Sequence, residues 1–208
     1  MPNINEVKMI KSISTLITNY LAKNNNSLTK HDLLKIQYSL QVVLGDLTKF
    51  IIIFLLFLCL NQLPLFLLAF VILISTRPLI GGIHCKTFNS CLIWSIMHFL
   101  IILLFSTMFP RLNTYFCMVF FVLSFITYFA YAPCNNEKRP IKNKKILKIL
   151  SLISLTFWCI LFFTLRNTQL CNCIFLSLLI QITQLIIINM KGVVSNAKIT
   201  KLFFSFTN

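Results

Sequence analysis

Charged residues are scarce in this sequence, and acidic residues are the scarcest of all. Only 11% of the 208 residues are charged, and only 4 are Asp or Glu. A soluble domain averages about 25% charged residues, which cover its surface. With 58% hydrophobic residues and a mean hydropathy of +0.86, this chain has to use lipid as its solvent. The shortage of charge therefore excludes an ordinary soluble domain and predicts an integral membrane protein.

Several recurrent cysteine and targeting patterns are also missing. The sequence has no Cys-x-x-Cys pair of the zinc-binding type, and Cys59, Cys117 and Cys159 lie inside apolar runs, where a thiol behaves as a small hydrophobe. A compact apolar core of the signal-peptide type does not follow the first lysines, and no internal repeat is evident. We therefore expect reduced thiols, no cofactor and no metal. A cysteine that has a function is expected to act as a nucleophile.

Apolar runs divide the chain into six predicted membrane spans. The second run is short for a bilayer, which needs about 20 residues, so it must continue through Pro78 towards Gly81. The predicted fold is an all-α polytopic membrane helix bundle, a single domain over 1–208 with its transmembrane helices in 30–190. The runs cover residues 50–60, 65–75, 91–109, 115–132, 146–165 and 170–190.

A further helix is predicted at the N-terminus, within residues 1–26. Its apolar residues recur at spacings of three and four, which is typical of an amphipathic helix that lies on a membrane surface. Asparagines at 24–26 end it, and Thr29 with Asp32 can cap the helix that follows. The apolar positions are Ile4, Val7, Ile10, Ile13, Ile17 and Leu21.

Basic residues predict the orientation of the chain. There are 19 Lys and Arg residues against 4 acidic ones, and the turns at 61–64, 110–114 and 166–169 hold only Arg111 and Arg166. With six spans, all the other basic residues fall on one side, which the positive-inside rule makes cytoplasmic. Both termini, the basic tail 191–208 and the segment 77–91 are therefore predicted to be cytoplasmic. Basic residues in this pattern set the membrane topology and contact anionic lipid, so nucleic acid is not an expected partner.

The segment 77–91 concentrates groups that can perform chemistry. His84 lies in a loop and Cys91 at the start of the third span, so an imidazole can accept the proton of a thiol that a helix N-terminus favours as a thiolate. Cys85 competes with Cys91 as the nucleophile, but it is adjacent to His84, and side chains adjacent in sequence usually diverge. His98 competes with His84 as the base, but it lies about 10 Å deeper than Cys91 along the helix axis, too far for direct proton transfer. A metal site of His84, Cys85 and Cys91 lacks a fourth ligand, so the pair His84–Cys91 is favoured.

Taken as a whole, the pattern resembles the AgrB family, the accessory gene regulator membrane endopeptidases of Gram-positive bacteria. The resemblance rests on Arg77, Gly81-Gly82, His84 and Cys91 with the interval between the last two. A second motif after the fourth span, Tyr131-Ala132-Pro133 followed by residues 137–141, supports it. The six-span layout and the length also fit, so the likeness covers nearly the whole chain.

The resemblance implies a function that the residues alone do not give. Such proteins process the propeptide AgrD into a cyclic autoinducing peptide for quorum sensing. On this interpretation Cys91 attacks the scissile carbonyl, His84 takes the thiol proton, and an internal cysteine or serine of the propeptide then resolves the thioester into a thiolactone or lactone. The resemblance also implies a homodimer.

Other residues are expected to support this site. Arg77 would stabilise the oxyanion or hold a substrate carboxylate, or else anchor its helix at the interface, and Gly82 would shape the loop. Asp46 is expected to pair with Lys49 rather than to be a third catalytic residue. A basic cluster would attract an acidic propeptide tail or serve topology and lipid contact: Lys138, Arg139, Lys142, Lys144 and Lys145.

The sequence also leaves two non-enzymatic interpretations open. A small non-enzymatic transporter or channel subunit would require charged or broken helices near the bilayer midplane, whereas these spans are nearly free of charge. A structural membrane partner with a degenerate site is the third alternative. Loss of cleavage on substitution of Cys91 or His84 separates the peptidase from both.

Overall fold

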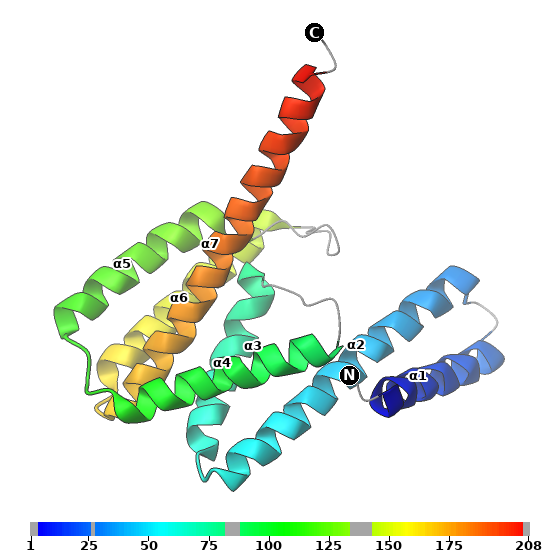
Figure 1. Cartoon of the computed structure of the whole chain (residues 1–208), viewed down its shortest axis with the longest axis horizontal. Coiled ribbons are helices and arrows are strands. Elements are labelled where there is room, and N and C mark those ends of the chain that lie inside the picture. The colour runs from blue at the N-terminus through cyan, green and yellow to red at the C-terminus, as the bar shows by residue number, and fades with distance from the viewer. Residues whose placement is uncertain (1–3, 26–27, 82–87, 134–142, 206–208) are drawn as a thin grey trace. The chain divides into compact units, whose positions relative to one another are not determined.

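The computed structural model describes residues 4–25, 28–81, 88–133 and 143–205, and these ranges contain seven helices and no strand (Figure 1). Side chains are described within 9–190. The helices are α1 (Ile4–Asn24), α2 (Lys30–Cys59), α3 (Leu63–Ile80), α4 (Phe88–Met108), α5 (Thr114–Tyr131), α6 (Lys144–Thr164) and α7 (Thr168–Ser205).

Six of these helices are long and apolar enough to cross a membrane, by length and composition. They are α2 to α6 and the part of α7 from Thr168 to Met190. The all-α multi-span fold predicted from the apolar runs is therefore confirmed, and α3 does continue through Pro78. One feature was not predicted. The basic tail begins as a helix, because α7 extends without interruption to Ser205.

Local chemistry explains where the helices begin and end. Thr29 caps α2 through a reciprocal pair of hydrogen bonds: its hydroxyl accepts from the backbone N–H of Asp32 at 3.2 Å, and the Asp32 carboxylate accepts from the backbone N–H of Thr29 at 3.2 Å. The next helix, α3, ends at Ile80, and the following residue, Gly81, has a φ of 92°, a conformation that favours glycine. Both signals were readable from the sequence.

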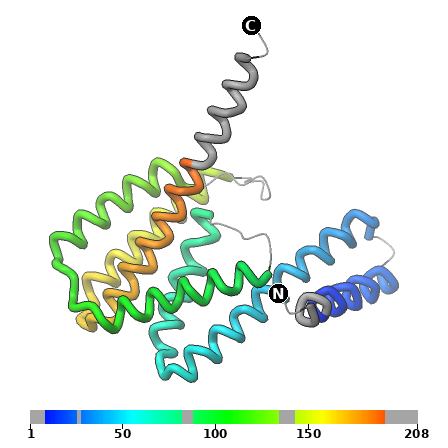
Figure 2. The backbone as a smooth tube through the Cα atoms, viewed as in Figure 1, coloured from blue at the N-terminus to red at the C-terminus, as the bar shows by residue number. Residues whose placement is uncertain are grey.

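The chain divides into two compact units, and the first comprises residues 1–63 and 85–97. Here α1 lies along the N-terminal half of α2 (Figure 2), and the Gln37 amide donates to the Thr15 hydroxyl at 2.9 Å. The buried residues of α1 are Ile10, Ser14 and Thr18, one turn apart. The predicted apolar stripe thus faces α2 only in part. Of its other members whose side chains are described, Ile13 and Ile17 are exposed and Leu21 is half-buried, and the neighbouring Met9, Leu16 and Tyr20 are exposed.

The second unit comprises residues 64–84 and 98–208. Within it α5, α6 and α7 pack against one another, and α7 is the most buried of the spans, with 67% of its apolar window inside. Its buried face is partly polar, because Asn172, Ser177 and Gln181 are all nearly inaccessible. Such residues form hydrogen bonds between helices where lipid offers none.

Three hydrogen bonds in the second unit show this polar packing. The indole N–H of Trp158 in α6 donates to the Ser75 hydroxyl in α3 at 2.9 Å. The Thr76 hydroxyl in α3 is hydrogen-bonded to the Gln181 amide oxygen in α7. The Asn172 amide donates to the backbone carbonyl of Phe109 at 2.9 Å, so α7 also holds the C-terminal end of α4.

Candidate functional site

Cys91 lies in the first turn of α4, where the backbone N–H groups have no partner within the helix. Its thiol is free and half-buried. The partial positive charge at a helix N-terminus favours an anionic sulfur there. One turn further along α4, the Ser95 hydroxyl donates to the backbone carbonyl of Cys91 at 2.9 Å.

The side chain in contact with the Cys91 sulfur comes from the middle of α2, which lies beside the start of α4 in the first unit (Figure 1). Lys49 Nζ donates to Cys91 Sγ at 3.5 Å. The same ammonium group lies 2.5 Å from Asp46 Oδ1. It also lies 5.7 Å from the centre of the Phe88 ring, within reach of a cation–π contact. Three different groups therefore surround one ammonium.

Exposure differs sharply between the two charged partners. The Lys49 side chain is 15% exposed and that of Asp46 is 67% exposed. The lysine therefore reaches inward to the sulfur, while the aspartate remains at the surface and holds the ammonium from its outer side. The ion pair predicted for Asp46 and Lys49 is confirmed.

Several predicted site residues lie outside the described residues. These are His84 and Gly82, together with the competitor Cys85 and the basic residues Lys138, Arg139 and Lys142. The pairing of His84 with Cys91 thus stays a prediction.

The other predicted residues are described. Arg77 is half-buried in the last turn of α3. Lys144 and Lys145 are exposed in the first turn of α6. Cations oppose the dipole of a helix N-terminus, so these two lysines do not serve the stability of their own helix.

Sequence reasoning missed the contact between Lys49 and Cys91. It treated Lys49 only as the partner of Asp46, because the two residues are three apart on one helix. The contact with Cys91 spans 42 positions of sequence. One signal was present: a lysine directly before a continuous apolar run must either extend along the helix to reach water or find a specific partner.

The remaining cysteines in the described residues are also free, but they differ from Cys91 in their surroundings. Cys117, Cys171 and Cys173 are buried within the second unit, and Cys59 is exposed at the C-terminal end of α2. Among described residues, no group of three or more His, Cys, Asp or Glu side chains is close enough together to hold a metal ion.

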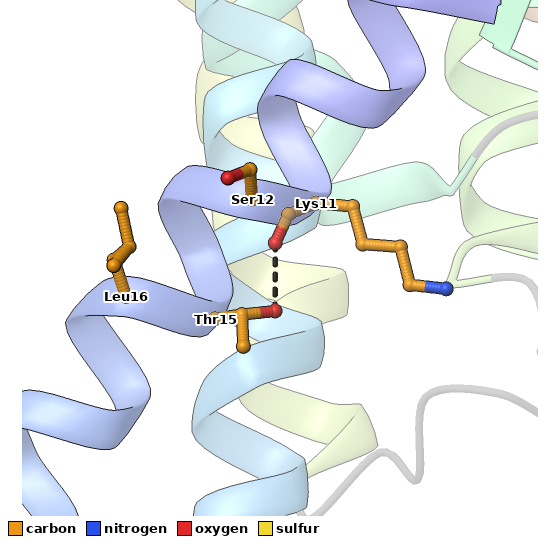
Figure 3. A pocket seen from close by; sticks show the side chains of 4 residues that line it. All are labelled: Lys11, Ser12, Thr15 and Leu16. Atoms are coloured by element: carbon orange, nitrogen blue, oxygen red, sulfur yellow. Dashed lines mark hydrogen bonds between the residues drawn. The ribbon is translucent and has the colours of Figure 1, made fainter.

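An open depression of about 350 Å³ lies on α1 (Figure 3). Its lining residues, Lys11, Ser12, Thr15 and Leu16, all come from adjacent turns of one helix. The Thr15 hydroxyl donates to the Lys11 carbonyl at 2.8 Å across it. With walls from a single helix, this depression is a surface groove and not an enclosed ligand site.

Comparison with known proteins places this chain in a family. A family model described as "AgrB: Accessory gene regulator B" matches residues 14–185. An AgrB-like protein of Clostridium beijerinckii is 60% identical over 199 residues, which cover 96% of this chain and 100% of the relative.

A second relative is more distant. The accessory gene regulator protein B of Staphylococcus intermedius is 29% identical over 133 residues, or 63% of this chain and 70% of the relative. No solved structure matches the chain. The family match and the Clostridium relative each cover most of the sequence, and the matched region includes Lys49, Arg77, His84 and Cys91. The chain belongs to the AgrB family, accessory gene regulator B, which supports a role in accessory gene regulator quorum sensing.

Proposed function

We propose that this protein is a membrane cysteine endopeptidase that cleaves an AgrD-type propeptide and closes the released segment into a ring. The observation that carries the proposal is the Cys91 thiol at the N-terminus of α4, half-buried and 3.5 Å from an ammonium group. Among the free cysteines described, it is the one with such a partner for a negative sulfur. Membership of the AgrB family supplies the substrate class.

The proposed reaction proceeds through a thioester. The Cys91 thiol gives its proton to His84, and the sulfur attacks the carbonyl carbon at the end of the future ring. A carbon–sulfur bond forms, the carbon–nitrogen bond breaks, and the departing amine takes the proton from His84. A thiol or hydroxyl within the propeptide then attacks the thioester, which closes the ring and returns the proton to Cys91.

Ring closure has to compete with hydrolysis of the thioester. The site must therefore hold the internal nucleophile close and limit access of water. A sulfur at the start of a membrane-spanning helix is suited to this demand, because α4 continues from Cys91 into a mostly apolar run. Arg77 and Gly82 are proposed to support the oxyanion and shape the loop.

The substrate is proposed to be positioned by charge. Lys144 and Lys145 are exposed at the start of α6, next in sequence to Lys138, Arg139 and Lys142. A basic cluster of this kind attracts an acidic peptide tail and, equally, anionic lipid. With the cytoplasmic orientation predicted from the basic residues, the propeptide would be met on the side where it is synthesised. A homodimer remains an expectation from the family.

Cleavage by the full-length protein in lipid vesicles tests the proposal directly. A synthetic propeptide is incubated with parent, Cys91→Ala and His84→Ala protein, and with Cys85→Ala as the matched control. We expect cleavage to fall by roughly 10³-fold or more in the first two variants and to persist in the control, because only the first two remove the nucleophile or its base. Cleavage that survives Cys91→Ala would overturn the mechanism.

The second half of the reaction needs its own experiment. A propeptide whose internal nucleophile is replaced by alanine can be cleaved but cannot close its ring. Such a peptide is expected to accumulate as a hydroxylamine-sensitive adduct on Cys91, seen by mass spectrometry of the intact protein. A non-enzymatic transporter predicts neither cleavage nor an adduct.

A further inference from the structure

Lys49 is placed unusually for a lysine at the edge of an apolar run. Such side chains normally extend along the helix so that the ammonium reaches water or lipid headgroups. Here the side chain is 15% exposed, and its ammonium is directed at the sulfur of Cys91 on another helix. Desolvation of a charge is costly, so a specific partner has to offset it.

Asp46 provides part of that offset. Its carboxylate lies one turn before Lys49 on α2, at 2.5 Å from the ammonium. A carboxylate this close keeps the ammonium in its charged form and fixes its position. The Phe88 ring, in the same turn of α4 as Cys91, limits movement on another side. The lysine is thus held charged and aimed at the thiol.

We propose that Lys49 is a catalytic residue that stabilises the Cys91 sulfur as an anion and thereby activates it for attack. This inference rests on the proposed function, because it concerns the nucleophile of that reaction. A cation in contact with a thiol lowers the free energy of the thiolate, and the N-terminus of α4 acts in the same direction.

The role assigned to Lys49 involves charge and not proton transfer. The proton of the thiol leaves to His84 and ends on the departing amine, as in the proposed reaction, while Lys49 keeps its own proton at every step. As the carbon–sulfur bond forms, negative charge moves from the sulfur to the carbonyl oxygen. An arginine at position 49 would also carry the charge and cannot act as a base.

The experiment measures the reactivity of Cys91 without any substrate. Full-length protein in vesicles is treated with iodoacetamide at neutral pH, and alkylation of each cysteine is followed over time by peptide mass spectrometry. Because the thiolate reacts and the thiol does not, Lys49→Met is expected to slow alkylation of Cys91 on the order of tenfold. The pH dependence of alkylation should also move to higher pH in this variant.

Matched variants separate charge from folding. Lys49→Arg should keep alkylation within a few-fold of the parent rate. Lys35→Met removes an exposed lysine from the same helix and should leave the rate unchanged. Far-UV circular dichroism of each variant, which should match that of the parent, shows that the helices are intact.

One outcome overturns the inference: Cys91 in Lys49→Met that reacts at the parent rate with the parent pH dependence. This failure is distinguishable from failure of the proposed function. If Cys91→Ala abolishes cleavage while Lys49→Met cleaves and alkylates like the parent, only the role of Lys49 is lost. If Cys91→Ala still cleaves the propeptide, the proposed function itself is wrong.

Discussion

Individual polar side chains in this protein serve two different purposes. Near Cys91 they place an ammonium and a carboxylate beside a half-buried thiol, and in the second unit they tie helices together. Trp158 illustrates the second purpose, because its ring is 3% exposed and its N–H donates to Ser75 at 2.9 Å. A buried indole N–H without a partner would be costly, more so where no water is available.

Substitution of Ser75 by alanine tests this hydrogen bond. The change leaves the Trp158 N–H without its acceptor, so the free energy of unfolding should fall by about 1 kcal/mol. Unfolding by SDS in mixed micelles, followed through tryptophan fluorescence, measures the difference.

Ser124→Ala is the appropriate control for Ser75→Ala. Ser124 is buried, and its hydroxyl donates to the Phe120 carbonyl of its own helix, so no partner on another helix is lost. Equal destabilisation by the two changes would show that the contact between α3 and α6 contributes nothing specific.

At the scale of helices, the ends of α2 and α3 were readable from the sequence. Thr29 and Asp32 form the predicted capping box, and Gly81 ends α3 in a left-handed conformation. These signals depend on residues within one turn of each other, so sequence alone contains them.

Which face of a helix is buried was much harder to predict. In α1 the buried residues include Ser14 and Thr18, whereas Ile13 and Ile17 are exposed. Hydrophobic periodicity cannot tell a face that meets lipid from one that meets another helix, because both can be apolar. The polar face of α7 was missed for the same reason.

The cap of α2 yields a second stability prediction. Thr29→Ala removes the acceptor for the Asp32 backbone N–H and should lower the free energy of unfolding by about 1 kcal/mol. Thr48→Ala makes the same chemical change inside α2, where the hydroxyl donates to the Leu44 carbonyl, and should be nearly neutral. Thermal unfolding in detergent, monitored by circular dichroism, measures both. A larger loss from Thr48→Ala would contradict the assignment of the cap.

At the scale of the whole molecule, composition determined the class of fold. Scarce charge and six apolar runs predicted six spanning helices, and in the described part of the chain six helices have the required length and hydropathy. The contact of Lys49 with Cys91 could not be predicted in this way. It joins residues 42 apart, and neither periodicity nor hydropathy contains information on which turns of two helices meet. The partner proposed for Cys91, His84, lies outside the described residues, so that pairing rests on the sequence.

The orientation of the spans is a prediction that fusion proteins can test. With six spans and the basic residues inside, both termini should be cytoplasmic. A fluorescent protein fused after Asn208 is expected to fluoresce, and alkaline phosphatase inserted in the turn at 166–169 is expected to be active. An active phosphatase at the C-terminus would reverse the orientation and place the segment 77–91 on the outside.

The sulfur and the ammonium of the proposed site are contributed by different helices, α4 and α2. A chain in which these two helices had not yet met would hold Cys91 without the ammonium beside it. The part of its reactivity that Lys49 is proposed to supply would arise only when tertiary structure forms. On the proposed role of Lys49, assembly therefore acts as a safeguard: the cell is exposed to a reactive cysteine only in a correctly folded enzyme, where the surrounding helices also restrict what that cysteine can reach.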